Sequence, residues 1–146
     1  MKTLTAIILL IATTTQAQFS LSTSAGYGIS VNSNLEYTLF QSVITITPKY
    51  KFNNLIIGVQ SNAVNSDSAT TMFNGLNASY IAKQFGPDKS LSLSAHFLLG
   101  FEGDMLTGAG LSYDWKQVGF DLSVSQEYNR RELWVIGGIR FAVIPF

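Results

Sequence analysis

A strict two-residue alternation in residues 118–146 constrains the fold more than any other feature of this sequence. Val118, Phe120 and Leu122 alternate with Gly119 and Asp121, and the pattern continues beyond a turn at residues 129–132. Successive side chains of a β-strand point to opposite faces of the sheet, so the pattern predicts a hairpin with one apolar and one largely polar face. Such a pattern is typical of a transmembrane β-hairpin.

The same alternation recurs along the chain and predicts eight strands with short turns between them. They cover residues 19–31, 37–52, 55–64, 71–85, 90–101, 105–115, 118–128 and 133–146. Asn53-Asn54 suits a tight turn, because asparagine tolerates the positive φ of two-residue hairpin loops. Pro48 lacks an N–H group, so we expect a bulge or a distortion there.

Strand registers follow from the turns, because facing residues of an antiparallel hairpin have a constant sum of residue numbers. The turns predict these facing pairs: Tyr50 with Ile57, Phe97 with Ala109, Tyr113 with Phe120, and Phe120 with Phe141. Each register keeps apolar beside apolar residues, whereas a one-residue slip would mix the faces. The chain is therefore predicted to be all-β, with an eight-stranded antiparallel up-and-down barrel.

The N-terminus has the composition of a secretory signal peptide. Lys2 supplies a positive start, residues 4–12 form an apolar core, and Thr15-Gln16-Ala17 forms a small-residue cleavage site. We expect residues 1–17 to be removed and residues 18–146 to form one barrel domain. The alternatives are an uncleaved anchor or a buried helix. Because the chain has no cysteine, a lipid-acylated lipoprotein is excluded.

Composition indicates which face of the barrel points outward. Charged residues make up 12% of the chain, against roughly 25% in soluble domains. A solvent-exposed Ser/Gly face should also carry Lys and Glu, and it carries few. Aromatic residues cluster near both strand ends on the apolar face, as in interfacial girdles: Phe19, Tyr50, Phe52, Trp115, Phe120 and Phe141 at one end, and Tyr27, Phe40, Phe101 and Tyr128 at the other. The apolar face is therefore predicted to meet lipid, which favours a transmembrane barrel over a soluble lipocalin-like one.

The signal peptide, the eight alternating strands and the terminal Phe146 together resemble the small bacterial outer-membrane β-barrels of the OmpX and OmpA-barrel kind. The resemblance spans residues 18–146 and is one of pattern, with no family-specific motif. It implies a location in the outer membrane, contact with outer-membrane lipid and insertion by the barrel-assembly machinery. That machinery recognises an aromatic-rich final strand, which Phe141, Val143 and Phe146 would supply, although Pro145 is unusual there.

Several polar residues fall on the predicted lumen face. Asp121 and Arg140 face each other in the predicted register, as a structural ion pair or, alternatively, as a gate or an ion path. His96, Lys83 and Glu127 are further predicted lumen residues. His96 could serve a Ser/His/acid hydrolase, but the chain has no His-x-Ser motif. A single histidine without cysteine argues against a transition-metal site, and no motif indicates a cofactor.

The expected function is that of a small structural or envelope-interaction protein with a packed lumen and no enzymatic activity. The zero net charge gives no indication of nucleic-acid binding. Two alternatives remain. One is a soluble secreted or periplasmic barrel that binds an apolar ligand, and the other is a lipid-modifying enzyme that uses His96.

Overall fold

The computed structural model describes residues 18–67 and 69–144, so the predicted signal peptide and Phe146 lie outside the described residues. All eight predicted strands are present, each within a few residues of its predicted bounds. They are β1 (Gln18–Val31), β2 (Tyr37–Phe52), β3 (Leu55–Ser66), β4 (Thr70–Gln84), β5 (Lys89–Gly100), β6 (Met105–Trp115), β7 (Val118–Glu127) and β8 (Glu132–Ile144). Within the described residues, no helix is long and apolar enough to cross a membrane.

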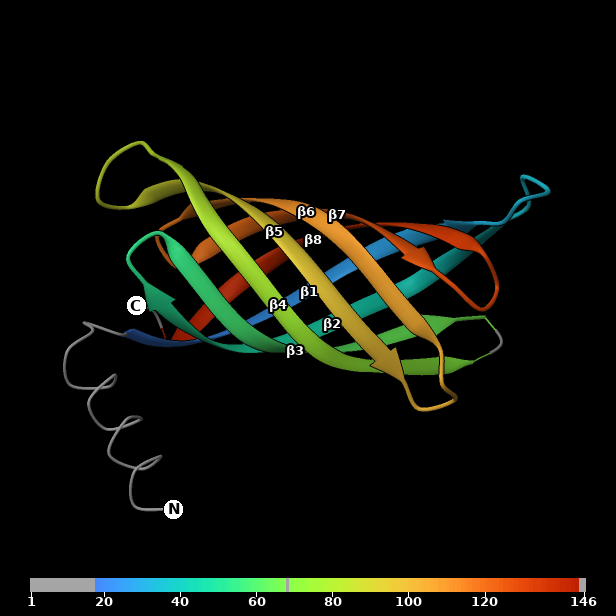
Figure 1. The fold of residues 1–146 in the computed structure, drawn as a ribbon. Coiled ribbons are helices and arrows are strands. Elements are labelled where there is room, and N and C mark those ends of the chain that lie inside the picture. Colours follow the sequence, from blue (N-terminus) through green and yellow to red (C-terminus); the bar gives the residue numbers. More distant parts are fainter. Residues whose placement is uncertain (1–17, 68, 145–146) are drawn as a thin grey trace, which may run out of the picture.

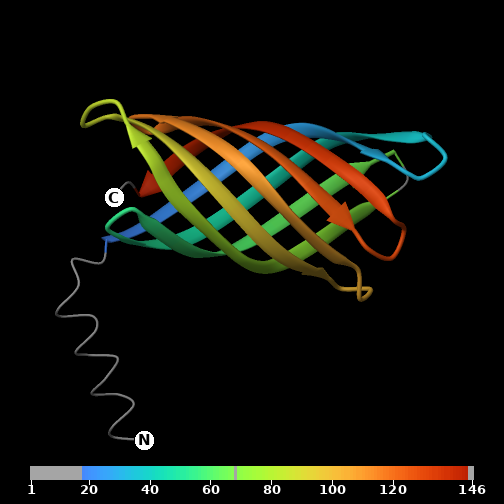
Figure 2. The ribbon, with the colours of Figure 1, turned by 45° about the horizontal axis from the view of Figure 1, so that its top comes forward.

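Each strand pairs antiparallel with its neighbours in sequence, and β1 pairs with β8 to close a barrel (Figure 1). The start of β1, the end of β8 and the connections at residues 53–54, 85–88 and 116–117 lie at one end, which we call the turn end (left in Figure 1). The other four connections lie at the opposite end, the loop end, and Figure 2 shows the tilted strands between the two ends. The predicted up-and-down barrel is confirmed.

The barrel wall has the predicted two faces, with apolar side chains outside and small polar side chains inside, except at the loop end, where several inward side chains are apolar. Ser22 and Ser125 are each 2% exposed, whereas Leu76 and Leu122 are 62% and 53% exposed. A water-soluble barrel would have the opposite arrangement, because burial of apolar surface stabilises its core. The outer surface of this barrel is therefore suited to an apolar surrounding.

Two predicted registers are confirmed and two are wrong by two residues. Tyr50 faces Ile57 and Tyr113 faces Phe120, as expected. By contrast, Phe97 faces Thr107 and Phe120 faces Ile139. Both errors come from the position of the turns, because the connections at 101–104 and 128–131 each begin one residue before the predicted turn. A shift of two residues preserves the faces of the strands, so the alternation gave no warning of it.

A bulge in β2 reverses the orientation of the strand near the loop end. Gln41 is one extra residue against both neighbouring strands, since Gly26 faces Val43 while Gly28 faces Phe40. Phe40 consequently points inward and is 6% exposed. The prediction that Phe40 belongs to an outer aromatic girdle is wrong for this reason. Phe101, by contrast, lies in a turn rather than in a strand and is 80% exposed.

A second bulge, at Ala82 in β4, places Lys83 outside the barrel. Ile81 faces Ser92 while Lys83 faces Leu91, so the strand has one extra residue there. Lys83 is exposed, with its Nζ 5.1 Å from the centroid of the Phe85 ring. The prediction that Lys83 lines the lumen is therefore wrong. At Pro48, where a bulge or a distortion was expected, the β2–β3 ladder is interrupted without a change of register, because Ile46 faces Ser61 and Lys49 faces Gly58.

Glycines allow the close approach of neighbouring strands at some inward positions. A Cβ atom at Gly75 would lie 2.0 Å from the Phe97 carbonyl oxygen, and one at Gly108 would lie 2.4 Å from that of Val124. Gly137 points outward, and a Cβ atom there would meet nothing closer than 3.9 Å. The wall thus needs glycine where its concave side is most crowded.

Candidate functional site in the barrel lumen

The loop end of the lumen is filled by apolar side chains, which we call the apolar plug. Its members are buried and come from six strands: Phe40, Val43, Val64, Phe73, Leu98, Leu106 and Trp134. The Trp134 ring lies 4.6 Å from the Phe40 ring and 5.4 Å from the Phe73 ring, measured between centroids. These tilted and edge-to-face contacts are those that aromatic rings prefer. The plug leaves little room for solutes at this end.

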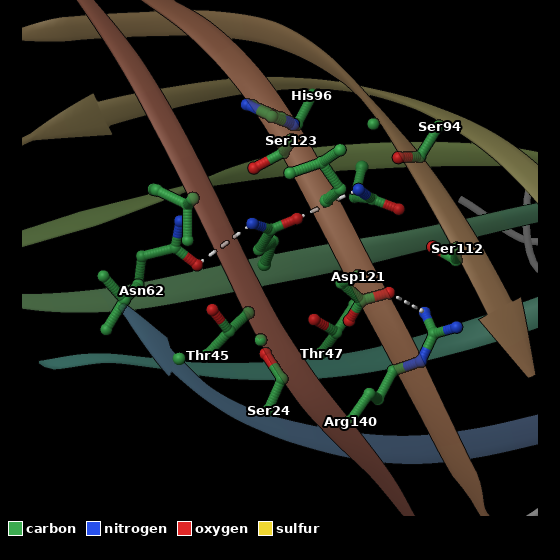
Figure 3. Close-up of a pocket in the computed structure, with 18 of the residues that line it drawn as sticks. Ser24, Thr45, Thr47, Asn62, Ser94, His96, Ser112, Asp121, Ser123 and Arg140 are labelled. Carbon is green, nitrogen blue, oxygen red and sulfur yellow. Dashed lines mark hydrogen bonds and ion pairs between the residues drawn. The ribbon is translucent and has the colours of Figure 1, made fainter. Parts of the chain in front are cut away.

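Below the plug lies a polar chamber of about 90 Å³, lined mainly by serine, threonine and amide side chains (Figure 3). Its amides form a chain in which Asn77 Nδ2 donates to Gln60 Oε1 (2.9 Å) and Gln60 Nε2 donates to Asn62 Oδ1 (3.0 Å). Ser79 Oγ donates to Asn77 Oδ1 at 3.1 Å. Because buried polar groups are costly without partners, this chain stabilises the polar interior.

His96 points into the polar chamber, as Figure 3 shows, and is 8% exposed. Its Nε2 lies 2.8 Å from Ser125 Oγ on β7. The two residues come close because His96 faces Gly108 on β6 and Gly108 faces Ser125 on β7. A hydrolytic triad also needs a carboxylate that orients the histidine. No side-chain hydrogen bond of the described residues joins His96 to a carboxylate. The pair thus has two members of such a triad and lacks the third.

Arg140 forms a charged cluster between the polar chamber and the turn end. Its Nη2 lies 2.5 Å from Asp114 Oδ1, and its Nη1 lies 3.4 Å from Asp121 Oδ1. Asp121 Oδ1 accepts no hydrogen bond within the described residues, so its contact with Arg140 is mainly electrostatic. Figure 3 shows the Arg140 side chain extending inside the lumen toward Asp121.

Asp114 is the member of this cluster that sequence reasoning missed. Arg140 faces Gly119 rather than Asp121, and Gly119 in turn faces Asp114. A Cβ atom at Gly119 would lie 2.6 Å from Asp114 Oδ1. The absent side chain therefore leaves the space through which Arg140 reaches across β7. The correct register would have identified Asp114 from the sequence, because all three positions share the inward face.

Glu127 lies at the loop end of the lumen and is 1% exposed. Its carboxylate accepts hydrogen bonds from the backbone N–H groups of Asn129 (3.0 Å) and Arg130 (2.6 Å). Charge-assisted bonds of this kind are stronger than neutral ones. Glu127 thus closes the β7–β8 turn and does not face an open passage.

The remaining predicted residues lie apart from the lumen. Phe141 and Val143 are 48% and 60% exposed on β8, and Val143 is an extra residue in the ladder with β1. Among the described residues, no group of three or more His, Cys, Asp or Glu side chains could hold a metal ion.

Comparison with known proteins shows similarity in structure but not in sequence. No protein-family model and no curated protein matches the chain. The structure of Neisserial surface protein A (NspA) aligns with a TM-score of 0.54 and 17% identity, over 86% of this chain and 97% of that one. The N-terminal β-barrel domain of Pseudomonas aeruginosa OprF aligns with a TM-score of 0.52 and 14% identity, over 86% and 99%. The chain therefore has the eight-stranded barrel fold of the small outer-membrane proteins.

Proposed function

We propose that this chain is an integral protein of the bacterial outer membrane that crosses the bilayer as a sealed barrel. The observation that carries the proposal is the inverted wall, with apolar side chains outside and small polar ones inside. Closed barrels are one of the two structures that satisfy every backbone hydrogen bond within a bilayer. Short turns typically face the periplasm, so the turn end would lie there and the loop end at the cell surface.

The lumen supports a structural or envelope-interaction role rather than transport. The apolar plug occupies the loop end, and the Arg140 cluster lies between the polar chamber and the turn end. Transport of solutes through a barrel, as in the porins, needs a continuous water-filled path. The short connections add little surface for a large receptor site, so the function would lie in the wall and in the two rims.

The two alternative functions have less support. A carrier of apolar ligands would need an apolar cavity, whereas the chamber is lined by polar side chains and the apolar part of the lumen is filled. A lipid-modifying enzyme would need an acid beside His96 and access for its substrate. His96 is instead buried beside Ser125, midway along the barrel.

Export and assembly are part of the proposal. Residues 1–17 would direct the chain across the inner membrane, and the barrel-assembly machinery would then insert it. The exposed positions of Phe141 and Val143 on β8 support this, because a final strand with outward aromatic and apolar side chains is accessible for recognition.

The test is the location and heat-modifiability of the full chain expressed in bacteria. We expect the mature protein in the outer-membrane fraction, extracted only by detergent, with a mobility shift between boiled and unboiled samples on a semi-native gel. A soluble protein without that shift would contradict the proposal.

A matched pair of leucine variants sharpens the test. Leu122 lies at the centre of β7 and Leu35 in the β1–β2 connection, and both are exposed (53% and 83%). Arginine facing the middle of a bilayer costs about 2–4 kcal/mol, so Leu122→Arg should reduce the folded, membrane-inserted fraction while Leu35→Arg should not. Equal tolerance of both substitutions would indicate that water surrounds the wall.

A further inference from the structure

Charge is segregated between the two ends of the barrel. Of the eight basic residues among positions 18–67 and 69–144, six lie at the turn end, including every lysine; three of the nine acidic residues lie there too. The formal charge is thus +3 at the turn end and −4 at the loop end. The near-zero net charge of the sequence conceals this polarity, which appears only when the strands are placed in the barrel.

The excess positive charge surrounds a cavity rather than a flat surface. The turn end opens into a basin of about 980 Å³, whose lining includes Lys49, Lys51, Lys89, Lys116 and Arg140. The carboxylates that line it are those of Asp88 and Asp114. Concave walls of low dielectric focus the field of such charges, and the volume is within the range of small-molecule sites.

The basin ends blindly. Lys49 and Arg140, together with Ser22 and Ser79, line both the basin and the polar chamber, so the two cavities meet at these side chains. Beyond the chamber, the apolar plug fills the lumen. An anion that entered from the turn end would therefore reach Lys49 and Arg140 and would then meet the plug.

We propose that this basin binds a phosphate-bearing anion. Arg140 is engaged by Asp114 and Asp121, and arginine binds both carboxylates and phosphates through paired parallel bonds. The cations spread around the basin are lysines, which bind phosphate as point charges. The phosphate could belong to a lipid headgroup or to a free phosphate ester, since both present the same anionic oxygens. This inference goes beyond the proposed function, because it assigns a ligand to the inside of the barrel.

The experiment compares two triple variants that remove the same charge. The basin variant carries Lys51→Gln, Lys89→Gln and Lys116→Gln. The control variant carries Lys83→Gln, Arg130→Gln and Arg131→Gln, none of which lines the basin. The sets match in detail: Lys116 and Arg131 both have a φ of 57°, and Lys89 and Lys83 each lie over one aromatic ring, of Trp115 and Phe85.

The probes are sodium tripolyphosphate and the short-chain lipid dihexanoyl-phosphatidylglycerol, with dihexanoyl-phosphatidylcholine as the zwitterionic control. Each is titrated by calorimetry into the full barrel in a neutral detergent, after the unboiled gel shift has shown that every variant is folded. We expect one-to-one binding of at least one anionic probe to the natural sequence. The basin variant should weaken it by about tenfold, and the control variant by less than about twofold.

The outcomes separate the two sources of phosphate and allow the proposal to fail. Tighter binding of phosphatidylglycerol would identify a lipid headgroup as the ligand, and tighter binding of tripolyphosphate a free phosphate ester. If neither anion binds, or if the control variant loses as much affinity as the basin variant, the basin is not an anion site.

Discussion

At the scale of single residues, Arg140 shows how much of the lumen depends on one cation. It lies between two carboxylates, and Lys49 adds a second positive charge within electrostatic reach. Removing one partner of a buried charge group leaves the others uncompensated, and this is more destabilising than replacing the whole group. The partial exposure of Asp114 and Asp121 moderates the effect.

Replacing Arg140 with leucine should therefore lower the free energy of unfolding by about 2 kcal/mol. The measurement is urea unfolding in detergent or lipid vesicles, followed by the gel shift. Adding Asp114→Asn and Asp121→Asn to Arg140→Leu should recover part of the loss, because no uncompensated carboxylate then remains. An unchanged urea midpoint for Arg140→Leu would show that the cluster contributes nothing to stability.

The sequence predicted correctly that most of the candidate lumen residues lie on the inward face of the barrel, but it did not predict all of their contacts. Asp121, Arg140, His96 and Glu127 all lie on the inward face, as the alternation predicted. The contacts of Arg140 with Asp114 and of His96 with Ser125 were not predicted. Contacts across strands depend on register, and a register depends on the position of each turn, which the alternation does not fix.

At the scale of elements, the bulge at Gln41 determines what fills the loop end of the lumen. Without the extra residue, Leu39 would point inward and Phe40 would point outward. The bulge instead brings Phe40 to the Trp134 ring. A sequence pattern cannot reveal this reversal, because both residues are large and apolar and either one suits the outer face.

Deleting Gln41 should withdraw Phe40 from the plug and leave Trp134 less shielded. We expect the fluorescence of Trp134 to shift to longer wavelength, measured in a Trp115→Phe background because the chain has two tryptophans. Gln41→Ala retains the extra residue and should leave the emission unchanged. Unaltered emission after the deletion would mean that the bulge does not position Phe40.

At the scale of the whole molecule, the barrel combines a loop end that holds the apolar plug with a positively charged turn end that opens into the basin. The fold class and the strand bounds could be predicted from sequence, because a period of two over eight segments admits few other structures. The inverted wall could be predicted because charged residues make up only 12% of the chain. The plug, the basin and the separation of charge could not. They arise from residues far apart in the chain that closure of the barrel and its bulges bring together at opposite ends.

The proposal of a sealed barrel predicts that the natural sequence conducts no steady current when it is inserted in a planar lipid bilayer. Ions would have to cross the apolar plug, where Leu98 and Leu106 are 0% exposed, and shedding their hydration there is costly. The double variant Phe73→Ala and Trp134→Ala removes two of the three aromatic rings of that plug and retains Phe40. It should produce discrete conductance steps. Phe97→Ala with Phe120→Ala removes two rings from the outer face, and it should remain silent. Steady conductance of the natural sequence, or equal behaviour of the two double variants, would place the barrier elsewhere than in the plug and would make the barrel a channel.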